Sequence, residues 1–488
     1  MVFRIRKLSV SLASLINFVI LFGLLLAPFF ASVSGLKSED FIYPLCLVMT
    51  FTVLWMFYSL KYIFDDLFNF YTLFLLAAVL FNGGQVFLEV FRLNKNGILD
   101  GEFSPEILVA TLYLVILSLA SFHAGGFFGF GKLPRTCIAT QEHSICQEIS
   151  ARTLRMVGYV LICVSIVPVL KMTFDAIQIV LQTGYLGLFQ REVATGMSSG
   201  LGGIMDSLAD FFMPGVLFVL AGSKGRAPTR NIIWASLLIY CCALLFLGHR
   251  SYATMFFIAG LWVRHKVVRP LPWHTIFILG AVLLFIVFPM IKLTRDMAWE
   301  TRVNPQVIAE SFLSLDEHPA IVAIKEMGGS MRTIAHTLNL IPGERPFAMG
   351  STYVYGASVL IPNLFWDVHP SVEHGNLGRW LTIIVDPYIF SLGGGLGYSF
   401  IAEAYANFGW WGVPFVMGLI GVMVAKVTRW AAEKDDYGRI AVVAGCIATM
   451  LFWPRADITI FVRMVGYYFL LPYAVFLFVR KKLYQQVR

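Results

Sequence analysis

Residues 106–130 read EILVATLYLVILSLASFHAGGFFGF, and Glu106 is the only Asp, Glu, Lys or Arg among them. A helix needs about 20 consecutive apolar residues to cross the hydrocarbon core of a bilayer. The run is long enough for one crossing. We therefore expect residues 106–130 to form a membrane-spanning helix.

Similar apolar runs, bounded by charged or turn residues, recur along the whole chain. They lie at about 9–31, 41–60, 67–91, 153–172, 207–222, 231–248, 251–263, 273–292, 397–425, 439–454 and 460–479. With 106–130 they make about twelve predicted spans, of which 251–263 is short. Because backbone polar groups must be satisfied inside lipid, we expect an all-α polytopic integral membrane protein.

The composition of the whole chain excludes a water-soluble globular protein. Of 488 residues, 58% are hydrophobic and 14% are charged, whereas soluble domains carry roughly a quarter charged residues. The net charge of +8 comes with no basic run interleaved with aromatic residues outside the spans, so no nucleic-acid partner is predicted. The seven cysteines do not form a disulfide framework.

The N-terminus predicts the orientation of the spans. Arg4, Arg6 and Lys7 precede an apolar run that is longer than the roughly 7 to 15 residues of a cleavable signal peptide, so we expect a retained first span. With this end in the cytoplasm, most Lys and Arg residues fall in cytoplasmic connections, as the positive-inside rule requires. Both termini are then cytoplasmic.

Three regions follow from this pattern. Residues 1–292 hold about nine N-terminal spans, residues 293–395 form one large external loop with short helices, and residues 396–488 hold about three C-terminal spans. A connection of about a hundred residues is far longer than usual, and such loops are usually functional. We therefore expect the active site to involve this loop.

Within the loop, residues 319–340 are predicted to be helical with an interruption at Gly328 and Gly329. Arg332 and His336 are four residues apart and share one helix face. A cation beside an imidazole suits an anionic substrate with a proton in transit. The alternative is a solvated helix face.

Residues 396–409 open a span and carry Ser399, Glu403 and Asn407 at four-residue spacing, which forms a polar stripe. An ionisable residue inside a membrane segment is a functional hypothesis by default. Glu403 facing a cavity would serve as a general base. The alternative is a structural pair between Glu403 and an arginine of a neighbouring helix.

Arg250 ends one predicted span directly before the next begins, so it is a fixed cation suited to a phosphate group. The segment 366–374 groups Asp367, His369, Glu373 and His374, but its spacing matches no metal-ligand pattern, and we expect a polar turn. The sequence contains no Walker A motif, dinucleotide fingerprint or Asp-x-Asp pair. We predict no metal and no cofactor.

Several short motifs resemble those of bacterial O-antigen polymerases of the Wzy type. They are GHR at 248–250, EMGGSMRT at 326–333, PFAMGSTY at 346–353, GYS at 397–399 and EAYANFG at 403–409. Arginine followed by ten residues and a glycine, a spacing associated with some of these enzymes, occurs at Arg191, Arg332, Arg345 and Arg455. The resemblance extends over most of the chain, including the number of spans and the position of the large loop.

The resemblance implies polymerisation of undecaprenyl-pyrophosphate-linked oligosaccharide units at the periplasmic face of the bacterial inner membrane. It implies a glycosyltransferase fold of the GT-C-like kind, similar to that of O-antigen ligases, with membrane lipids and a polysaccharide chain-length regulator as further candidate partners. Guanidinium groups would clamp the pyrophosphate in place of a metal. The candidates for this clamp and for glycan contacts are Arg250, Arg332, Arg295, Arg379, Arg191, Tyr353 and Tyr405, and those for the base are Glu403 and His336.

Two other functions fit the same spans. An O-antigen ligase would move a finished glycan onto a lipid A core, and the motifs after Pro346 favour the polymerase over it. A transporter or flippase of the lipid-linked sugar would show paired halves with helices broken at corresponding positions. The sequence shows no such repeat, and a transporter would hardly need so large a loop.

Overall fold

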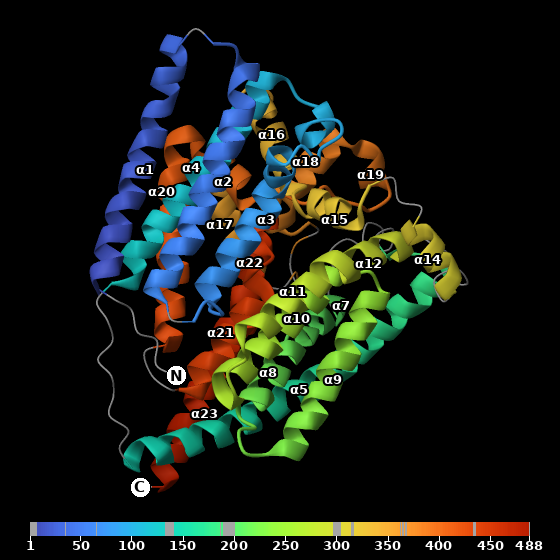
Figure 1. The fold of residues 1–488 in the computed structure, drawn as a ribbon. Helices are drawn as coiled ribbons and strands as arrows, with labels where there is room; N and C mark the ends of the chain where they lie inside the picture. The colour runs from blue at the N-terminus through green and yellow to red at the C-terminus, as the bar shows by residue number, and fades with distance from the viewer. Residues whose placement is uncertain are drawn as a thin grey trace.

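The computed structural model describes residues 7–34, 36–64, 66–131, 141–185, 187–188, 201–295, 304–313, 317–361, 363, 366, 368–432 and 436–487. The described residues are 83% helical and contain no strand. Figure 1 shows that the long helices form two neighbouring groups, with the helices of the connecting segment 296–399 gathered mainly at one end. The expected all-α architecture is confirmed.

The first group contains α1 (Lys7–Ser34), α2 (Ser38–Ile63), α3 (Phe70–Val90), α4 (Pro105–Phe130) and α20 (Phe400–Ala432). α20 packs along the length of α4. A Cβ atom on Gly421 would lie 1.9 Å from the carbonyl oxygen of Phe122, so a side chain there would collide with backbone. Small residues therefore let these two helices approach closely, as is common in membrane bundles.

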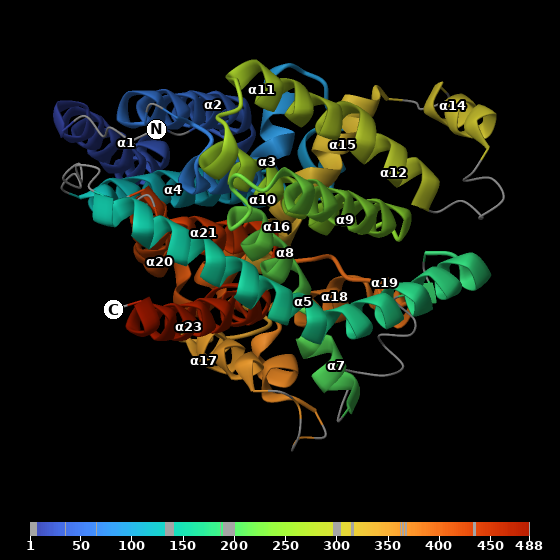
Figure 2. The same ribbon diagram turned by 90° about the horizontal axis from the view of Figure 1, so that it is seen from below.

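The second group lies beside the first, as the view in Figure 2 shows. It contains α5 (Gln141–Thr183), α7 (Leu201–Ala209), α8 (Phe212–Ala221), α9 (Ala227–Phe246), α10 (Arg250–Val263), α11 (Trp273–Val282), α12 (Phe288–Arg295), α21 (Tyr437–Met450), α22 (Ile458–Met464) and α23 (Leu471–Val487). π-helical turns at Arg264–Val268, Leu283–Val287 and Val465–Leu470 continue α10, α11 and α22.

Eleven helices of the described residues are long and apolar enough to cross a membrane. They correspond to eleven of the twelve predicted runs. The remaining run, 251–263, forms α10, whose 14 residues fall below the length of a full crossing. A π-helical turn continues α10 to Val268, and this turn supplies the length that the apolar run alone lacks. The chain is therefore a multi-pass membrane protein.

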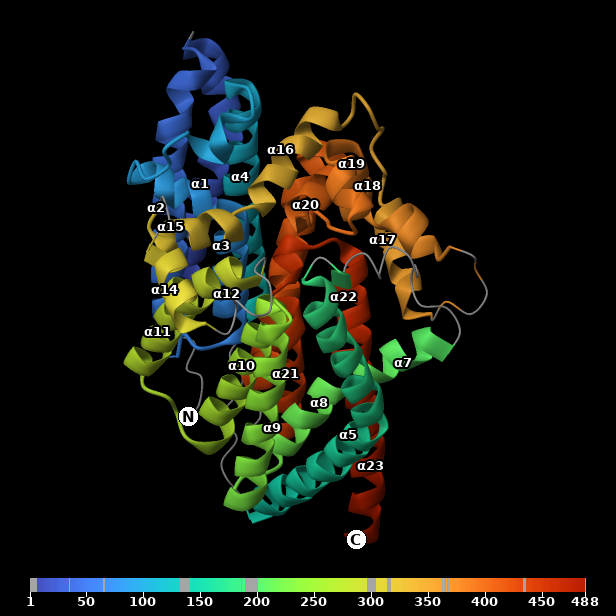
Figure 3. The same cartoon turned by 90° about the vertical axis from the view of Figure 1, so that its right-hand side faces the viewer.

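The connecting segment adds α14 (Pro305–Leu313), α15 (Pro319–Met327), α16 (Ser330–Leu340), α17 (Ser351–Ala357), α18 (Leu377–Val385) and α19 (Pro387–Ser391). α15 and α16 confirm the predicted helix with a break at Gly328 and Gly329. At one end of the bundle, α3 joins α4, and α20 and α22 begin. We call this end the loop end. α15 packs against α3, α16 against α4 and α20, and α17 against α22, and Figure 3 shows α16 to α19 around the start of α20.

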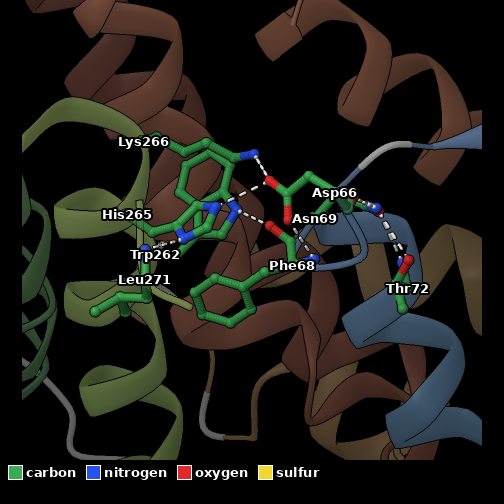
Figure 4. A network of polar contacts seen from close by, with 8 residues as sticks. All are labelled: Asp66, Phe68, Asn69, Thr72, Trp262, His265, Lys266 and Leu271. Carbon is green, nitrogen blue, oxygen red and sulfur yellow. Dashed lines mark hydrogen bonds and ion pairs between the residues drawn. The ribbon is translucent and has the colours of Figure 1, made fainter. Parts of the chain in front are cut away.

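At the opposite end, a buried ionic cluster joins the two helix groups (Figure 4). Asp66, in the connection between α2 and α3, pairs with the adjacent His265 and Lys266 of the π-turn after α10. The distance from His265 Nε2 to Asp66 Oδ2 is 2.9 Å, and the Lys266 contact is shorter still. The indole nitrogen of Trp262 donates to the carbonyl of Phe68 at 3.1 Å, beside the cluster.

A second buried network surrounds an intramembrane histidine, His123. The Ser59 hydroxyl donates to the carbonyl of Met56, so the Nε2 atom of His123, 2.8 Å from Ser59 Oγ, must donate to it. The Tyr71 hydroxyl oxygen lies 3.1 Å from Nδ1. Both ring nitrogens of His123 therefore have partners, and these contacts join α2, α3 and α4.

Candidate functional site

Arg332 and His336 share one face of α16, as the sequence predicts, and both contact the connection between α3 and α4. Arg332 lies 3.0 Å from Asp100 and 2.9 Å from Glu102. The Nε2 atom of His336 lies 3.3 Å from a Glu102 oxygen. Because two carboxylates neutralise Arg332, its guanidinium is not a free anion-binding group in this structure.

The α3–α4 connection is held in a conformation that exposes its two acids to α16. Leu99 and Asp100 both have left-handed backbone torsions, with φ of 54° and 57°, which few residues other than glycine adopt. The amide of Leu99 donates to the Gln85 side chain, whose amide nitrogen donates in turn to the carbonyl of Lys325. α15 and the end of α3 therefore fix the position of Asp100 and Glu102.

His336 is a partly enclosed imidazole. Its side chain is 12% exposed, and its ring lies edge-to-face with Phe103 at 4.8 Å. Nε2 is buried with no aligned hydrogen bond, although the Glu102 carboxylate is near. Burial and the Arg332 guanidinium lower the pKa of His336 below its usual range, while Glu102 acts in the opposite direction. The neutral imidazole is therefore the main form at pH 7 and is able to accept a proton.

Arg250 also reaches the loop end, at the start of α10. Its guanidinium forms a two-pronged ion pair with Glu326 of α15, one contact of which is 2.9 Å. The side chains are 11% and 18% exposed, so the pair is largely buried. The predicted fixed cation is present, but its charge joins α10 to α15 rather than facing an empty site.

Two other arginines of the connecting segment lie over aromatic rings instead of carboxylates. Arg345 lies 4.9 Å from the ring of Trp380, and Arg379 lies 5.2 Å from the ring of Phe390. Neither has an ion-pair partner among the described residues. A guanidinium that stacks on a ring keeps its N–H donors for a ligand. Arg345 and Arg379 are thus the more available cations.

Glu403 is buried, and its hydrogen bonds connect α20 with α17 and α22. Its side chain accepts hydrogen bonds from the Thr352 hydroxyl of α17 at 3.0 Å and from the Ile458 amide of α22 at 2.8 Å. Asn407 donates to Thr352 at 2.7 Å and accepts from the amide of Gly350 at 3.0 Å. The predicted polar stripe is confirmed, but Glu403 is 1% exposed and its partners are not arginines.

Ser399 completes the stripe, because its hydroxyl donates to Asn82 of α3 at 2.7 Å. Asp457, a second buried carboxyl group, directly precedes α22. It accepts hydrogen bonds from the amides of Thr459 and Gly378. Burial raises the pKa of Asp457 above its usual range. The N-terminus of a long helix favours anions, which explains how two carboxyl groups are accommodated at this point.

Arg345 acts electrostatically on Tyr398, which directly precedes Ser399. Tyr398, whose hydroxyl lies 3.1 Å from that of Thr337 in α16, interacts electrostatically with Arg345, Glu403 and Asp457. Burial raises the pKa of Tyr398, so it remains a neutral phenol. Arg345 is therefore a partly buried cation in the neighbourhood of Tyr398. The sequence contained one signal for it, the spacing from Arg345 to Gly356, and no signal for Asp457.

The predicted glycan-binding tyrosines occupy different environments. Tyr353 of α17 is partly buried and stacks with Phe408 at 6.1 Å. Tyr405 is 4% exposed, and its hydroxyl donates to the carbonyl of Ile341 at 3.3 Å, so its ring is part of the core in this conformation. Arg191 lies outside the described residues, and the side chain of Arg295 is not among those described.

The turn at 366–374 is held by its own histidine. The ring of His369 contacts Ser371 at 2.7 Å and the carbonyl of Ile361 at 3.0 Å, and it is 1% exposed. Within the described ranges, no three His, Cys, Asp or Glu residues are placed to hold a metal ion. Asp367 lies outside the described residues.

The fold is that of a multi-pass helical membrane protein. Its charged and titratable candidate residues lie at the loop end, in or next to the long connecting segment. The family model described as O-antigen polysaccharide polymerase Wzy matches residues 15–487. The chain therefore belongs to the Wzy family of O-antigen polysaccharide polymerases, as the motifs indicated. No curated protein and no solved structure gives a significant match.

Proposed function

We propose that this protein joins undecaprenyl-pyrophosphate-linked oligosaccharide repeat units into a surface polysaccharide at its loop end. The family supports a repeat-unit polymerase that acts on a lipid-linked substrate. The observation that carries the assignment of the site is the partly enclosed, neutral His336 beside Glu102, with the available cation Arg345 in the same connecting segment. The loop end would face the periplasm and both termini the cytoplasm of the bacterial inner membrane.

In the proposed reaction, a hydroxyl of the incoming unit attacks the anomeric carbon of the growing chain. The bond from that carbon to the lipid pyrophosphate breaks, and the pyrophosphate leaves with the bonding electrons. His336 takes the hydroxyl proton, and Glu102 stabilises the imidazolium that forms. Glu403 is the alternative base, and its proton would have to pass through the hydroxyl of Thr352.

The leaving pyrophosphate carries negative charge that donors must stabilise. Arg345 and Arg379 are better placed for this than Arg250 and Arg332, whose guanidinium groups are engaged by acids. Fixed guanidinium donors would stabilise the charge that develops on the leaving group, so no metal is required. We also propose a fold of the GT-C-like kind, residues 293–395 as the periplasmic loop, and a chain-length regulator as a partner.

The test is incubation of the purified protein in nanodiscs with the lipid-pyrophosphate-linked repeat unit, in EDTA and without nucleotide. A ladder of glycans at repeat-unit spacing is expected. A single addition that appears only with a lipid A core acceptor would make the protein a ligase. Movement of the lipid across vesicles without any product would make it a transporter, and either result would overturn the proposal.

A further inference from the structure

The segment 346–366 differs from the rest of the connection because it contains no Lys, Arg, Asp or Glu. It includes α17 and leaves several large apolar side chains bare. Met349 is 77% exposed and Val354 is 71% exposed. Tyr355, Leu360 and Ile361 are also exposed. A connection surrounded by water on all sides would not be expected to gather so many exposed apolar groups.

The opposite face of α17 is fixed to the protein. Thr352 and Gly356 are buried, and a Cβ atom on Gly356 would lie 2.4 Å from a side-chain carbon of Ile458. The amides of Ala348 and Met349 donate to the carbonyls of Ala406 and Asn407. The segment is therefore held rigidly by one face, and its apolar face points away from the protein.

This apolar face continues into the exposed stripe of a membrane-spanning helix. Trp411, Phe415 and Leu419 recur at four-residue spacing along α20 after the non-helical backbone at Gly409, and Phe408 lies just before that break; all four are exposed. Tyr353 stacks on Phe408, and Gly350 lies against the same ring. α17 thus lies at the level of the first turns of α20, just before the Trp410–Trp411 pair, and tryptophans are enriched at membrane interfaces.

We propose that residues 346–361 of this segment form a membrane-interface element whose Met349 and Val354 side chains contact the acyl chains of bilayer phospholipids. The stripe on α20 must face lipid wherever that helix spans the membrane, and the bare face of α17 extends it without a charged residue between them. The helix in this segment, α17, has 7 residues, so it is too short to span a bilayer and can lie along the interface. The proposal does not depend on the reaction proposed above.

The test places nitroxide spin labels on cysteine variants of an otherwise cysteine-free chain, in nanodiscs of phosphatidylethanolamine and phosphatidylglycerol. Val354→Cys is compared with Phe415→Cys on the α20 stripe and with Glu373→Cys, whose native side chain is 58% exposed. Relaxation at Val354 is expected to respond to oxygen, which partitions into lipid, as it does at Phe415. A response to a water-soluble nickel chelate, as at Glu373, would overturn the proposal.

A second measurement uses the unaltered protein, so it does not depend on the folding of a cysteine-free chain. Hydroxyl radicals generated in water oxidise exposed methionines faster than histidines. In the same nanodiscs, Met349 is expected to be oxidised more slowly than His374, whose side chain is 49% exposed. Oxidation of Met349 faster than His374 would show that this face of α17 is in water and would also overturn the proposal.

Discussion

At the scale of single residues, the environment of each charge decides which arginines and carboxyl groups are available for chemistry. The sequence predicted Arg332 and Arg250 as anion-binding groups, and the structure pairs both with acids. Asp457 emerges only in three dimensions, and Arg345 had only its spacing to Gly356 as a signal, because their neighbours Trp380, Gly378 and Tyr398 are distant in the chain. Spacing along a helix correctly predicted that Arg332 and His336 share a face, but it could not identify the acids opposite them.

The lowered pKa of His336 predicts how polymerisation depends on pH. A base must be neutral, so the rate is expected to be constant above the pKa of His336 and to fall as the pH drops through it. Because burial and Arg332 hold this pKa below the usual value of a histidine, about 6.5, the loss occurs below that pH. The initial rate of ladder formation between pH 4.5 and 8 measures it, and a decline that begins above pH 7 would contradict the assignment.

Arg345→Ala tests the proposed anion site. Loss of one charge-assisted hydrogen bond, worth about 1.5–3 kcal/mol, would weaken transfer by roughly 10- to 150-fold. The matched control is Arg439→Ala, since Arg439 lies 5.0 Å from the Trp430 ring on the opposite side of the bundle. Ladder formation from both variants at equal protein abundance is the measurement. Equal activity of the two would remove Arg345 from the site.

At the scale of helices, apolar runs and Gly or Pro breaks predicted most elements, because a membrane span leaves a strong local pattern. The packing of α4 on α20 could not be predicted, since it depends on glycines that meet across 300 residues of sequence. The same holds for α17, whose contacts with α20 and α22 follow from Thr352, Asn407 and Glu403 meeting in space. Hydrogen-bond partners between distant segments are not encoded in any local period.

The α4–α20 contact predicts which glycines tolerate a methyl group. In Gly421→Ala the new Cβ would meet the Phe122 carbonyl at 1.9 Å, so the helices must separate and the melting temperature in detergent is expected to fall. Gly280→Ala in α11 is the control, because nothing lies within 4 Å of its Cβ position. Alanine there should leave the melting temperature unchanged or raise it slightly. Equal melting temperatures for the two variants would refute the close approach.

At the scale of the whole molecule, the two helix groups are joined at their opposite end by Asp66, His265 and Lys266. Breaking such a pair on one side strands a buried charge and typically costs about 3–5 kcal/mol. Asp66→Asn is therefore expected to lower the melting temperature markedly, and the double variant Asp66→Asn with Lys266→Met to recover part of the loss. Thermal unfolding by size-exclusion chromatography measures this, and an Asp66→Asn protein as stable as the native one would contradict it.

The same cluster makes the stability of the folded protein depend on pH under acidic conditions. The pKa of Asp66 is lowered to about 2, chiefly because hydrogen bonding to His265 and the Lys266 charge outweigh the opposing effect of burial. A carboxyl group whose pKa is lowered by folding stabilises the fold at pH values above its unfolded pKa of about 4. This stabilisation is lost as the pH falls toward 2. The native protein should therefore lose more stability than Asp66→Asn when both are taken from pH 5 to pH 3.

The central claim is that the loop end of this Wzy-family protein polymerises lipid-linked repeat units with His336 as the proton acceptor. The most direct measurement compares the initial rate of ladder formation by the native protein, His336→Asn and the control Asn339→Ala, an exposed residue on the same helix. His336→Asn is expected to be slower by about 10²- to 10⁴-fold, with the control unchanged. A His336→Asn protein that makes the same ladder at the native rate would contradict the account.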